Sequence, residues 1–354
     1  MNMKIYDVII IGGGQAGLSV AYFLKKHNLD YLILDNNAEA GGSWLKVWDS
    51  LKLFSPGIYS SLSGWMIRPP KEEYPDKNEF ISYMSDYEKR YDFPIKRPVN
   101  VTSVTHDGEY YHIQTDGDNY ISRTVIGCTG TAANPKIPTY EGIEKFKGEQ
   151  LHSVNYKNPE QLKGKKILIV GGGNSGAQIV SELTKTNKVQ WATITPPTFL
   201  PDDVDGRYLF NNATQKYRSL LKGEVNKEEY SLADIVMIDS VKDARERGVL
   251  HARRSTFSFS SDGVIWEDGT SEAFDAVIWC TGFKANLSFL SDLNIVDNGE
   301  VKTNGTRVEL LKGLWLVGYG NWTGFASATI YGVGKTAKNT VEEVIEYLIN
   351  LKFG

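Results

Sequence analysis

The sequence predicts an α/β protein made of two similar domains, each built around a parallel sheet. Two observations carry this prediction. A glycine-rich turn follows an apolar, strand-like run at Gly12 and again at Gly171, and a helical pattern begins directly after each turn. A Cys-Thr-Gly turn also occurs twice, at Cys128 and at Cys280, each time after another apolar run. The chain therefore contains a repeat of one βαβ-based unit.

Composition excludes several classes of partner. The 354 residues include 39 basic and 43 acidic side chains, which give a net charge of −4. This balance offers no field that would attract nucleic acid or an anionic membrane. The apolar run at the N-terminus is too short for a signal peptide, and no run reaches the roughly 18 apolar residues of a membrane span. We therefore expect a cytoplasmic protein.

The two cysteines, Cys128 and Cys280, are too few and too far apart in sequence for a disulfide framework or a zinc site. They also do not form a Cys-x-x-Cys redox pair, because each precedes a Thr-Gly turn. No metal is expected.

The first repeat has the signature of a Rossmann-like dinucleotide-binding domain. The apolar run Ile5 to Ile11 leads into Gly12-Gly13-Gly14-Gln15-Ala16-Gly17 and then into a helical pattern. In such a turn the first glycine permits the tight bend, the second lets a pyrophosphate approach, and the third lets helix and strand pack closely. The next apolar strand ends in Asp35, whose carboxylate is placed to accept hydrogen bonds from a ribose.

The second repeat has the same turn but a different recognition residue. Gly171-Gly172-Gly173-Asn174-Ser175-Gly176 follows the apolar run Ile167 to Val170. The next strand ends in Thr193-Ile194-Thr195, with neither an acid for a 2′-hydroxyl nor an arginine for a 2′-phosphate. The fold class is therefore α/β with two Rossmann-like dinucleotide-binding domains, of which the second should discriminate loosely between NADH and NADPH.

The predicted boundaries follow from the repeat. Residues 1–157 and 284–354 form the first domain, and residues 158–283 form the second. The first is expected to be discontinuous because the strand ending at Asn321 and the helix from Ala326 can return a helix N-terminus to the first cofactor.

Two further segments have alternative explanations. The aromatic loop containing Trp44, Trp48 and Phe54 is expected to line a planar cofactor, the alternative being ordinary loop packing. Four arginines, Arg245, Arg247, Arg253 and Arg254, can meet a phosphate or an anionic substrate, although a scattered basic surface is the favoured explanation.

With these residues in place, the chain resembles the flavin-containing monooxygenases, in particular the short bacterial single-component members of class B type. Phe146, Gly148, His152 and Tyr156 match that family's Phe-x-Gly-x-x-x-His-x-x-x-Tyr fingerprint between two Gly-x-Gly-x-x-Gly motifs. The resemblance extends over most of the chain. We interpret these four residues as a hinge that fixes the alignment of the two domains.

The resemblance implies FAD at the first turn and NADPH or NADH at the second. It also implies a C4a-hydroperoxyflavin that oxygenates soft nucleophiles, by sulfoxidation, N-oxidation or Baeyer-Villiger oxidation of ketones. The FAD residues would be Gly12, Gly14, Gln15, Ala16, Gly17, Asp35, Gly42, Ser43, Trp44, Leu53, Phe54, Val104, Thr129, Gly130 and Asn321. The NAD(P) residues would be Gly171, Gly173, Asn174, Ser175, Gly176, Thr193, Thr195, Thr281 and Gly282.

The flavin does the chemistry in such enzymes, so no catalytic acid-base pair is required. Phe54, Arg207 and Asn321 are the candidates for residues near its reacting ring. The partners would be a small-molecule substrate and O2, and the aromatic content suits a homodimer interface.

Two departures from the family pattern have consequences. Thr195 stands where many relatives have an arginine, so NADH should serve nearly as well as NADPH. Phe54 lies near the position of a flavin-side asparagine in animal-type members and cannot donate a hydrogen bond. Leakage of hydrogen peroxide is the resulting hypothesis, and an NAD(P)H oxidase or flavin reductase without oxygen transfer is the alternative function. A flavin-binding sensor without turnover is disfavoured because it would not need the second turn.

Overall fold

A computed structural model describes residues 3–209, 231, 234–324 and 326–353. The α/β prediction is confirmed, and the chain divides into two compact units. Unit 1 comprises Met1–Leu45, Pro56–Asn134 and Lys284–Gly354, and unit 2 comprises Lys46–Ser55 and Pro135–Phe283. Each unit contains one glycine turn at the carboxyl end of a parallel strand.

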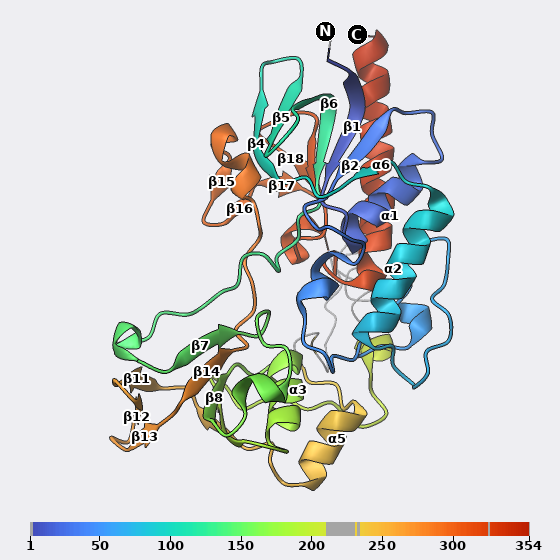
Figure 1. The fold of residues 1–354 in the computed structure, drawn as a ribbon. Helices are drawn as coiled ribbons and strands as arrows, with labels where there is room; N and C mark the ends of the chain where they lie inside the picture. The colour runs from blue at the N-terminus through green and yellow to red at the C-terminus, as the bar shows by residue number, and fades with distance from the viewer. Residues whose placement is uncertain (1–2, 210–230, 232–233, 325, 354) are drawn as a thin grey trace, which may run out of the picture. The chain divides into compact units, whose positions relative to one another are not determined.

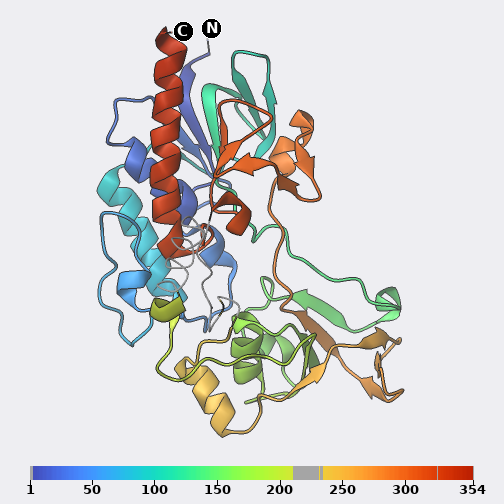
Figure 2. The ribbon, with the colours of Figure 1, turned by 180° about the vertical axis from the view of Figure 1, so that it is seen from behind.

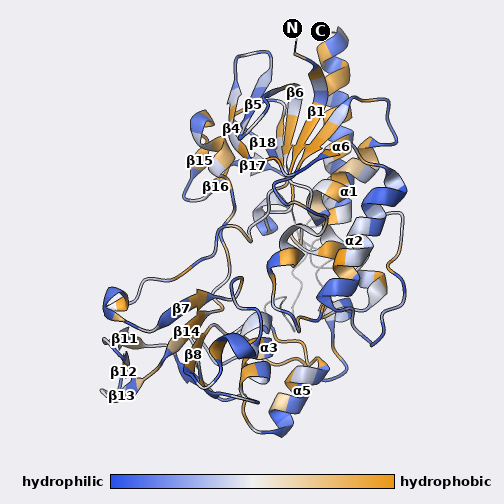
Figure 3. Cartoon of the chain, viewed as in Figure 1, coloured by the Kyte–Doolittle hydropathy of each residue, from blue (hydrophilic) through white to orange (hydrophobic). Residues whose placement is uncertain are grey.

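Unit 1 is organised around a sheet in the order β17-β18-β19-β6-β1-β2-β3, in which the run from β19 to β3 is parallel. Its strands are β1 (Ile5–Ile11), β2 (Tyr31–Leu34), β3 (Ile95–Lys96), β6 (Tyr120–Gly127), β17 (Thr303–Asn304), β18 (Arg307–Val308) and β19 (Leu314–Leu316). The apolar runs of β1 and β2 form the orange centre of this sheet in Figure 3. Val8, Ile9 and Ile10 are completely buried because both faces of the sheet are covered.

The described part of unit 1 also contains three α-helices, two further strands of the same sheet and a separate two-stranded sheet. The helices are α1 (Gln15–Leu24), α2 (Lys77–Tyr91) and α6 (Ile330–Phe353), and the additional strands are β4 (Val101–His106), β5 (Tyr111–Thr115), β15 (Val296–Asp297) and β16 (Glu300–Val301). Helix α1 packs against α6, whose long axis is seen in Figures 1 and 2. A capping box between Asp76 and Glu79 begins α2.

Unit 2 contains a five-stranded parallel sheet in the order β10-β9-β8-β14-β7. Its strands are β7 (Glu149–His152), β8 (Lys166–Val170), β9 (Lys188–Thr193), β10 (Ala252–Arg254) and β14 (Ala276–Trp279), and its helices include α3 (Asn174–Leu183) and α5 (Asp239–Glu246). A small antiparallel sheet of β11 (Phe257–Phe259), β12 (Gly263–Trp266) and β13 (Ser271–Ala273) shares an aromatic core with it.

The compact units differ from the predicted domains in residues 135–157. The prediction assigned this segment to the first domain, but it belongs to unit 2. Strand β7 lies within it and pairs in parallel with β14, so that Trp279 is opposite His152. Phe146 is buried in the core of unit 2. The segment belongs to unit 2 because it supplies the edge strand of that unit's sheet.

A second difference concerns residues 46–55, which also belong to unit 2. The backbone N–H of Asp49 donates to the carbonyl of Lys157 at 2.8 Å, and Gly206 N–H donates to the carbonyl of Phe54 at 2.9 Å. A Cβ built on Gly206 would lie 2.7 Å from the Cβ of Ser55, so only glycine permits this approach. The sequence offered no sign that ten residues of the first repeat would pack on the second unit.

The described residues offer neither a membrane-spanning helix nor a metal-binding cluster. None of the described helices is both long enough and apolar enough to cross a membrane. Among the same residues, no three His, Cys, Asp or Glu side chains are grouped so that they could hold a metal ion.

Candidate functional site

The first glycine turn leaves no room for a side chain at two of its three motif glycines. A Cβ on Gly12, where φ is +107°, would lie 2.5 Å from the carbonyl oxygen of Cys128. A Cβ on Gly17 would lie 2.0 Å from the carbonyl oxygen of Gly12. The turn is therefore pressed against the end of β6 and against the start of α1, as the fingerprint predicts.

The surroundings of this turn fit a dinucleotide pyrophosphate. Gly42, with φ +55°, approaches so closely that a Cβ there would lie 2.8 Å from the Cα of Gly14. The start of α1 points its free N–H groups toward the same turn, because the helix begins at Gln15. Two backbones held this close form a narrow cradle that an anionic group can enter but a side chain cannot.

Gln15 holds three segments of unit 1 together. Its Oε1 accepts a hydrogen bond from Trp44 Nε1 at 3.0 Å, and its Nε2 donates to the carbonyl of Ala328 at 2.8 Å. The segment before α6 therefore lies beside the start of α1. Trp44 packs edge-on against Phe80 at a centroid distance of 4.8 Å. The residues predicted near the first turn, from Gly42 to Trp44, are brought to it.

Asp35 directly follows β2, where a dinucleotide-binding fold has the acid that accepts from a ribose. The residue is 1% exposed, and its Oδ1 accepts from the Asn37 side chain at 3.1 Å. Its Oδ2 lies 2.9 Å from Arg97 Nη2 without hydrogen-bond geometry, and it makes no hydrogen bond among the described residues. A buried carboxylate oxygen with an unused lone pair beside a glycine turn fits a ribose hydroxyl donor.

Arg97 connects Asp35 to a second acid that sequence reasoning missed. Its guanidinium donates to both carboxylate oxygens of Glu88, at 2.7 and 2.9 Å, while it faces Asp35. The three side chains come from different elements, so no local pattern in the sequence connects them. The pair fixes the orientation of the Asp35 carboxylate.

The closing turn of unit 1 meets a further residue that was not predicted. The phenol oxygen of Tyr319 accepts a hydrogen bond from Thr129 N–H at 3.1 Å and lies 2.7 Å from Thr129 Oγ1. At Gly318 a Cβ would lie 2.8 Å from the Cβ of Ala16. The Gly-Tyr-Gly sequence after β19 was the signal that could have revealed this contact. Gly130 and the exposed Asn321 lie in the same unit.

Several residues predicted for the FAD site are deeply buried or belong to unit 2. Val104 is completely buried in the core of unit 1 and offers no side-chain surface to a ligand. Leu53 and Phe54 belong to unit 2, as does Trp48, whose ring is 5% exposed and offers no open platform. Arg207 is also in unit 2, where its Nη2 lies 2.9 Å from Asp205. The three candidates for the reacting ring, Phe54, Arg207 and Asn321, are therefore not gathered within one unit.

The second glycine turn repeats the geometry of the first. With φ at +130°, a Cβ on Gly171 would lie 2.1 Å from the carbonyl oxygen of Cys280, and one on Gly176 would lie 2.3 Å from that of Gly171. Gly173 has no neighbour within 4 Å of a built Cβ, so its backbone is open to an approaching ligand. Helix α3 begins directly after it, with Asn174 and Ser175 as its first two residues.

The asparagine of this turn is occupied by neighbouring backbone. Asn174 Nδ2 donates to the carbonyl of Asp234 at 3.0 Å, and its Oδ1 accepts from Val236 N–H at 2.9 Å. At the end of β9, Thr193 is buried and Thr195 is exposed. Neither contributes a charge at the position where a 2′-hydroxyl or 2′-phosphate is recognised.

The four residues of the linker fingerprint all belong to unit 2. His152 Nε2 donates to the carbonyl of Gly282 at 2.9 Å, and burial lowers the pKa of the imidazole. Tyr156 Oη donates to Glu182 at 2.6 Å. Gly148 is needed because a Cβ there would lie 2.2 Å from the ring of Phe146.

His152 is thereby bonded to the segment at which the chain leaves unit 2 after Phe283. The carbonyl of Gly282 also accepts from Lys136 N–H at 2.9 Å, and Thr281 Oγ1 donates to the carbonyl of Lys136 at 2.5 Å. The edge of the Phe283 ring lies against the imidazole, at 4.7 Å between centroids. The imidazole therefore joins β7 to the segment at Gly282, which in turn holds the segment at Lys136.

The cysteines do not provide redox chemistry. Both are buried and free, and burial raises the pKa of the Cys280 thiol to about 12 and that of Cys128 well above its usual range. Buried thiols that stay protonated near neutral pH are poor nucleophiles. The sequence likewise contains no Cys-x-x-Cys pair.

With their two glycine turns, the units have the fold of flavoproteins that bind two dinucleotides. Residues 9–318 match the family model described as pyridine nucleotide-disulphide oxidoreductase. A flavin-containing monooxygenase from Stenotrophomonas maltophilia is 43% identical, with a TM-score of 0.89 over 98% of this chain and 99% of that one. The chain belongs to the flavin-containing monooxygenase family.

The chain is also similar to two other oxidoreductases. An uncharacterized oxidoreductase, CzcO of Bacillus subtilis strain 168, is 30% identical over 96% of this chain and 99% of its own length. The bacillithiol disulfide reductase of Bacillus cereus is 18% identical with a TM-score of 0.72, covering 96% of this chain and 99% of that chain, and shows the shared fold alone. The chain is thus an oxidoreductase of a family that binds FAD and NAD(P).

Proposed function

We propose that this protein is an NAD(P)H-dependent flavin monooxygenase that transfers one oxygen atom of O2 to soft nucleophiles, with organic sulfides as the preferred substrate class. The observation that carries the proposal is the pair of matching glycine cradles without an accessible redox cysteine. Two cradles serve two dinucleotides, and with both thiols buried the redox chemistry would fall to the flavin and the nicotinamide. The similarity to the Stenotrophomonas enzyme supports the same conclusion.

The residues of unit 1 fit FAD. The Gly12 to Gly17 turn and the start of α1 would receive the pyrophosphate, and Asp35 would accept from the adenosine ribose, held in place by Arg97. Trp44 and Gln15 would close the loop over the bound group. When bound, FAD supplies hydride acceptance from NAD(P)H and the activation of O2.

The residues of unit 2 fit NADH or NADPH. Gly173 leaves the backbone of the turn open, and α3 directs its N-terminal N–H groups to the same place. We expect loose discrimination between the two nucleotides, because no acid would repel a 2′-phosphate at Thr193 or Thr195 and no arginine in that strand end would bind it. His152 would keep the nicotinamide half aligned through its hydrogen bond to Gly282.

The overall reaction consumes one sulfide, one O2, one NAD(P)H and one proton, and yields one sulfoxide, one water and one NAD(P)+. The purified, FAD-loaded protein should therefore oxidise methyl phenyl sulfide with either nucleotide. The sulfoxide is quantified by chromatography, and hydrogen peroxide is measured in parallel. We expect kcat/KM for NADH and NADPH to agree within about 100-fold, a difference of less than about 3 kcal/mol in transition-state stabilisation.

Phe54 favours a second function, NAD(P)H oxidase activity. Its side chain has no hydrogen-bond donor at a position where animal-type relatives have an amide. Peroxide in excess of sulfoxide would show that part of the NAD(P)H is consumed without oxygen transfer to the sulfide. Peroxide equal to the NAD(P)H consumed, with no sulfoxide from sulfide or amine substrates, would replace the monooxygenase proposal with the oxidase.

A further inference from the structure

Strand β10 brings an arginine beside the nucleotide-recognition end of β9. The two strands are parallel, and Arg254 is the partner of Thr193 in their register. Ser255 N–H donates to the carbonyl of Thr193 at 2.8 Å, so the pairing continues to the carboxyl edge. Neighbouring strands lie about 4.8 Å apart, which is well within the reach of an arginine side chain.

Arg254 and Thr193 occupy the same face of the sheet, because partners in register point to the same side. On that face a Cβ built on Gly172 would lie 3.3 Å from the methyl group of Thr193. Trp191, two residues earlier on β9, donates from Nε1 to the carbonyl of Gly171 at 2.8 Å. This face therefore carries the second glycine turn and the start of α3.

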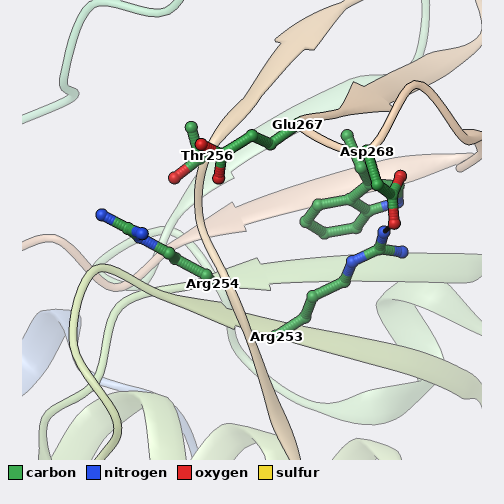
Figure 4. A pocket seen from close by; sticks show the side chains of 6 residues that line it. Arg253, Arg254, Thr256, Glu267 and Asp268 are labelled. Carbon is green, nitrogen blue, oxygen red and sulfur yellow. Dashed lines mark hydrogen bonds and ion pairs between the residues drawn. The ribbon is translucent and has the colours of Figure 1, made fainter.

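The preceding arginine has a different role. Arg253 is in register with Ala192 and therefore points to the opposite face. Its guanidinium lies 4.1 Å from the Trp266 ring centroid and 2.5 Å from Asp268. Figure 4 shows the two guanidinium groups directed to opposite sides of their strand. The charge of Arg253 is thus compensated, whereas no ion pair within the described ranges involves Arg254.

The surroundings of Arg254 form a cavity of about 340 Å³. The residues that line it are Arg253, Arg254, Thr256, Trp266, Glu267 and Asp268. The arginines and acids are equal in number, and Asp268 is already paired with Arg253. Exposed Glu267 opposes an incoming anion and limits how strongly the site can favour one.

We propose that Arg254 binds the 2′-phosphate of NADPH and is the specificity-determining residue for this nucleotide. The inference rests on the proposed binding of NAD(P)H at the second glycine turn. Arginine is suited to phosphate because its planar guanidinium can donate two parallel hydrogen bonds. Arg254 of the next strand takes the role of the arginine that many relatives have at the position of Thr195. The opposing Glu267 keeps the preference for NADPH over NADH modest. This accounts for an enzyme that uses both nucleotides.

The test compares Arg254→Gln with the matched control Arg253→Gln. Calorimetry measures binding of 2′,5′-ADP, which carries the 2′-phosphate, and of ADP, which lacks it, to the FAD-loaded protein. In Arg254→Gln the affinity for 2′,5′-ADP relative to ADP should fall about 10- to 100-fold, as expected when a charge-assisted hydrogen bond is lost. In Arg253→Gln this ratio should fall much less, by at most about threefold, because that guanidinium lines the cavity but is already paired with Asp268.

In each variant the ratio of kcat/KM for NADPH to that for NADH should follow the ratio of binding affinities, falling in Arg254→Gln and changing little in Arg253→Gln. Arg254→Lys should recover part of the ratio. Equal losses for both nucleotides in Arg254→Gln, or no loss at all, would overturn the assignment of Arg254. If neither nucleotide reduces the wild-type flavin, the proposed function fails instead. The comparison of 2′,5′-ADP with ADP still decides the role of Arg254 in that event.

Discussion

Arg97 is the residue whose removal should have the largest effect on the stability of unit 1. Its side chain is 15% exposed and lies between two acids, Asp35 at 2% and Glu88 at 12%. In Arg97→Met these carboxylates would stay buried without their shared counter-charge. Removing one partner of a buried ion pair typically costs about 3 to 5 kcal/mol. We expect a loss of this size in the free energy of unfolding, measured by urea titration, together with weaker retention of FAD.

The neighbouring Lys96 provides the control. Its ammonium lies 3.9 Å from Asp118 on an exposed surface, and such pairs contribute less than about 1 kcal/mol. Equal destabilisation in Lys96→Met and Arg97→Met would show that the buried position of the Arg97 pair is not the cause.

The residues of both glycine turns could be predicted because their requirement is local. A strand, a turn and a helix follow one another in sequence, so the close contacts of Gly12 and Gly171 are implied by the spacing. The contacts of Arg97 and Tyr319 could not be predicted, and for Arg254 the sequence favoured a scattered basic surface over a phosphate site. Each depends on a partner from another element, and only the folded chain brings the two together.

At the scale of elements, β7 carries the alignment that we propose for the linker fingerprint. His152 ends this strand and holds the carbonyl of Gly282, next to the crossing after Phe283. In His152→Ala the loss of this hydrogen bond should slow anaerobic flavin reduction by NADH at least about tenfold, because small misplacements of reacting groups are costly. Stopped-flow absorbance gives the rate, and the ratio of flavin to protein gives FAD retention, which should not change.

Tyr156→Phe is the matched variant, since it removes the hydrogen bond to Glu182 and leaves the contact with Gly282 intact. It should reduce the flavin faster than His152→Ala. The alignment role would be refuted if His152→Ala lost its FAD while the remaining flavin was reduced at the normal rate.

The same strand shows why elements were harder to predict than turns. Strand β7 has only four residues, Glu-Gln-Leu-His, without an apolar run or a clear alternation. It forms a strand because β14 offers a free edge, and this is a tertiary effect. The small sheet of β11, β12 and β13 was likewise not predicted, because its strands are only three or four residues long. Residues 210–230 lie outside the described residues.

At the scale of the whole molecule, the repeat was sufficient for the fold class but not for the boundaries. The two sheets and the two turns follow from duplicated patterns in the sequence. The chain, however, passes between the units after Leu45, Ser55, Asn134 and Phe283. The first two crossings lie in an aromatic loop, where neither composition nor periodicity indicates which unit will bury it. Contacts such as that between Gly206 and Phe54 decide the outcome.

If the first turn holds FAD, the second turn should hold the nicotinamide nucleotide that reduces it. The most direct measurement is anaerobic mixing of NADH with FAD-loaded wild-type protein and with Gly171→Ala, followed by flavin absorbance. A Cβ at Gly171 would lie 2.1 Å from the Cys280 carbonyl oxygen, so the variant should distort the second turn alone. We predict rapid bleaching in the wild type and retained but unreduced FAD in the variant. An FAD that stays oxidised in the wild type, or is reduced equally fast in the variant, would contradict the account.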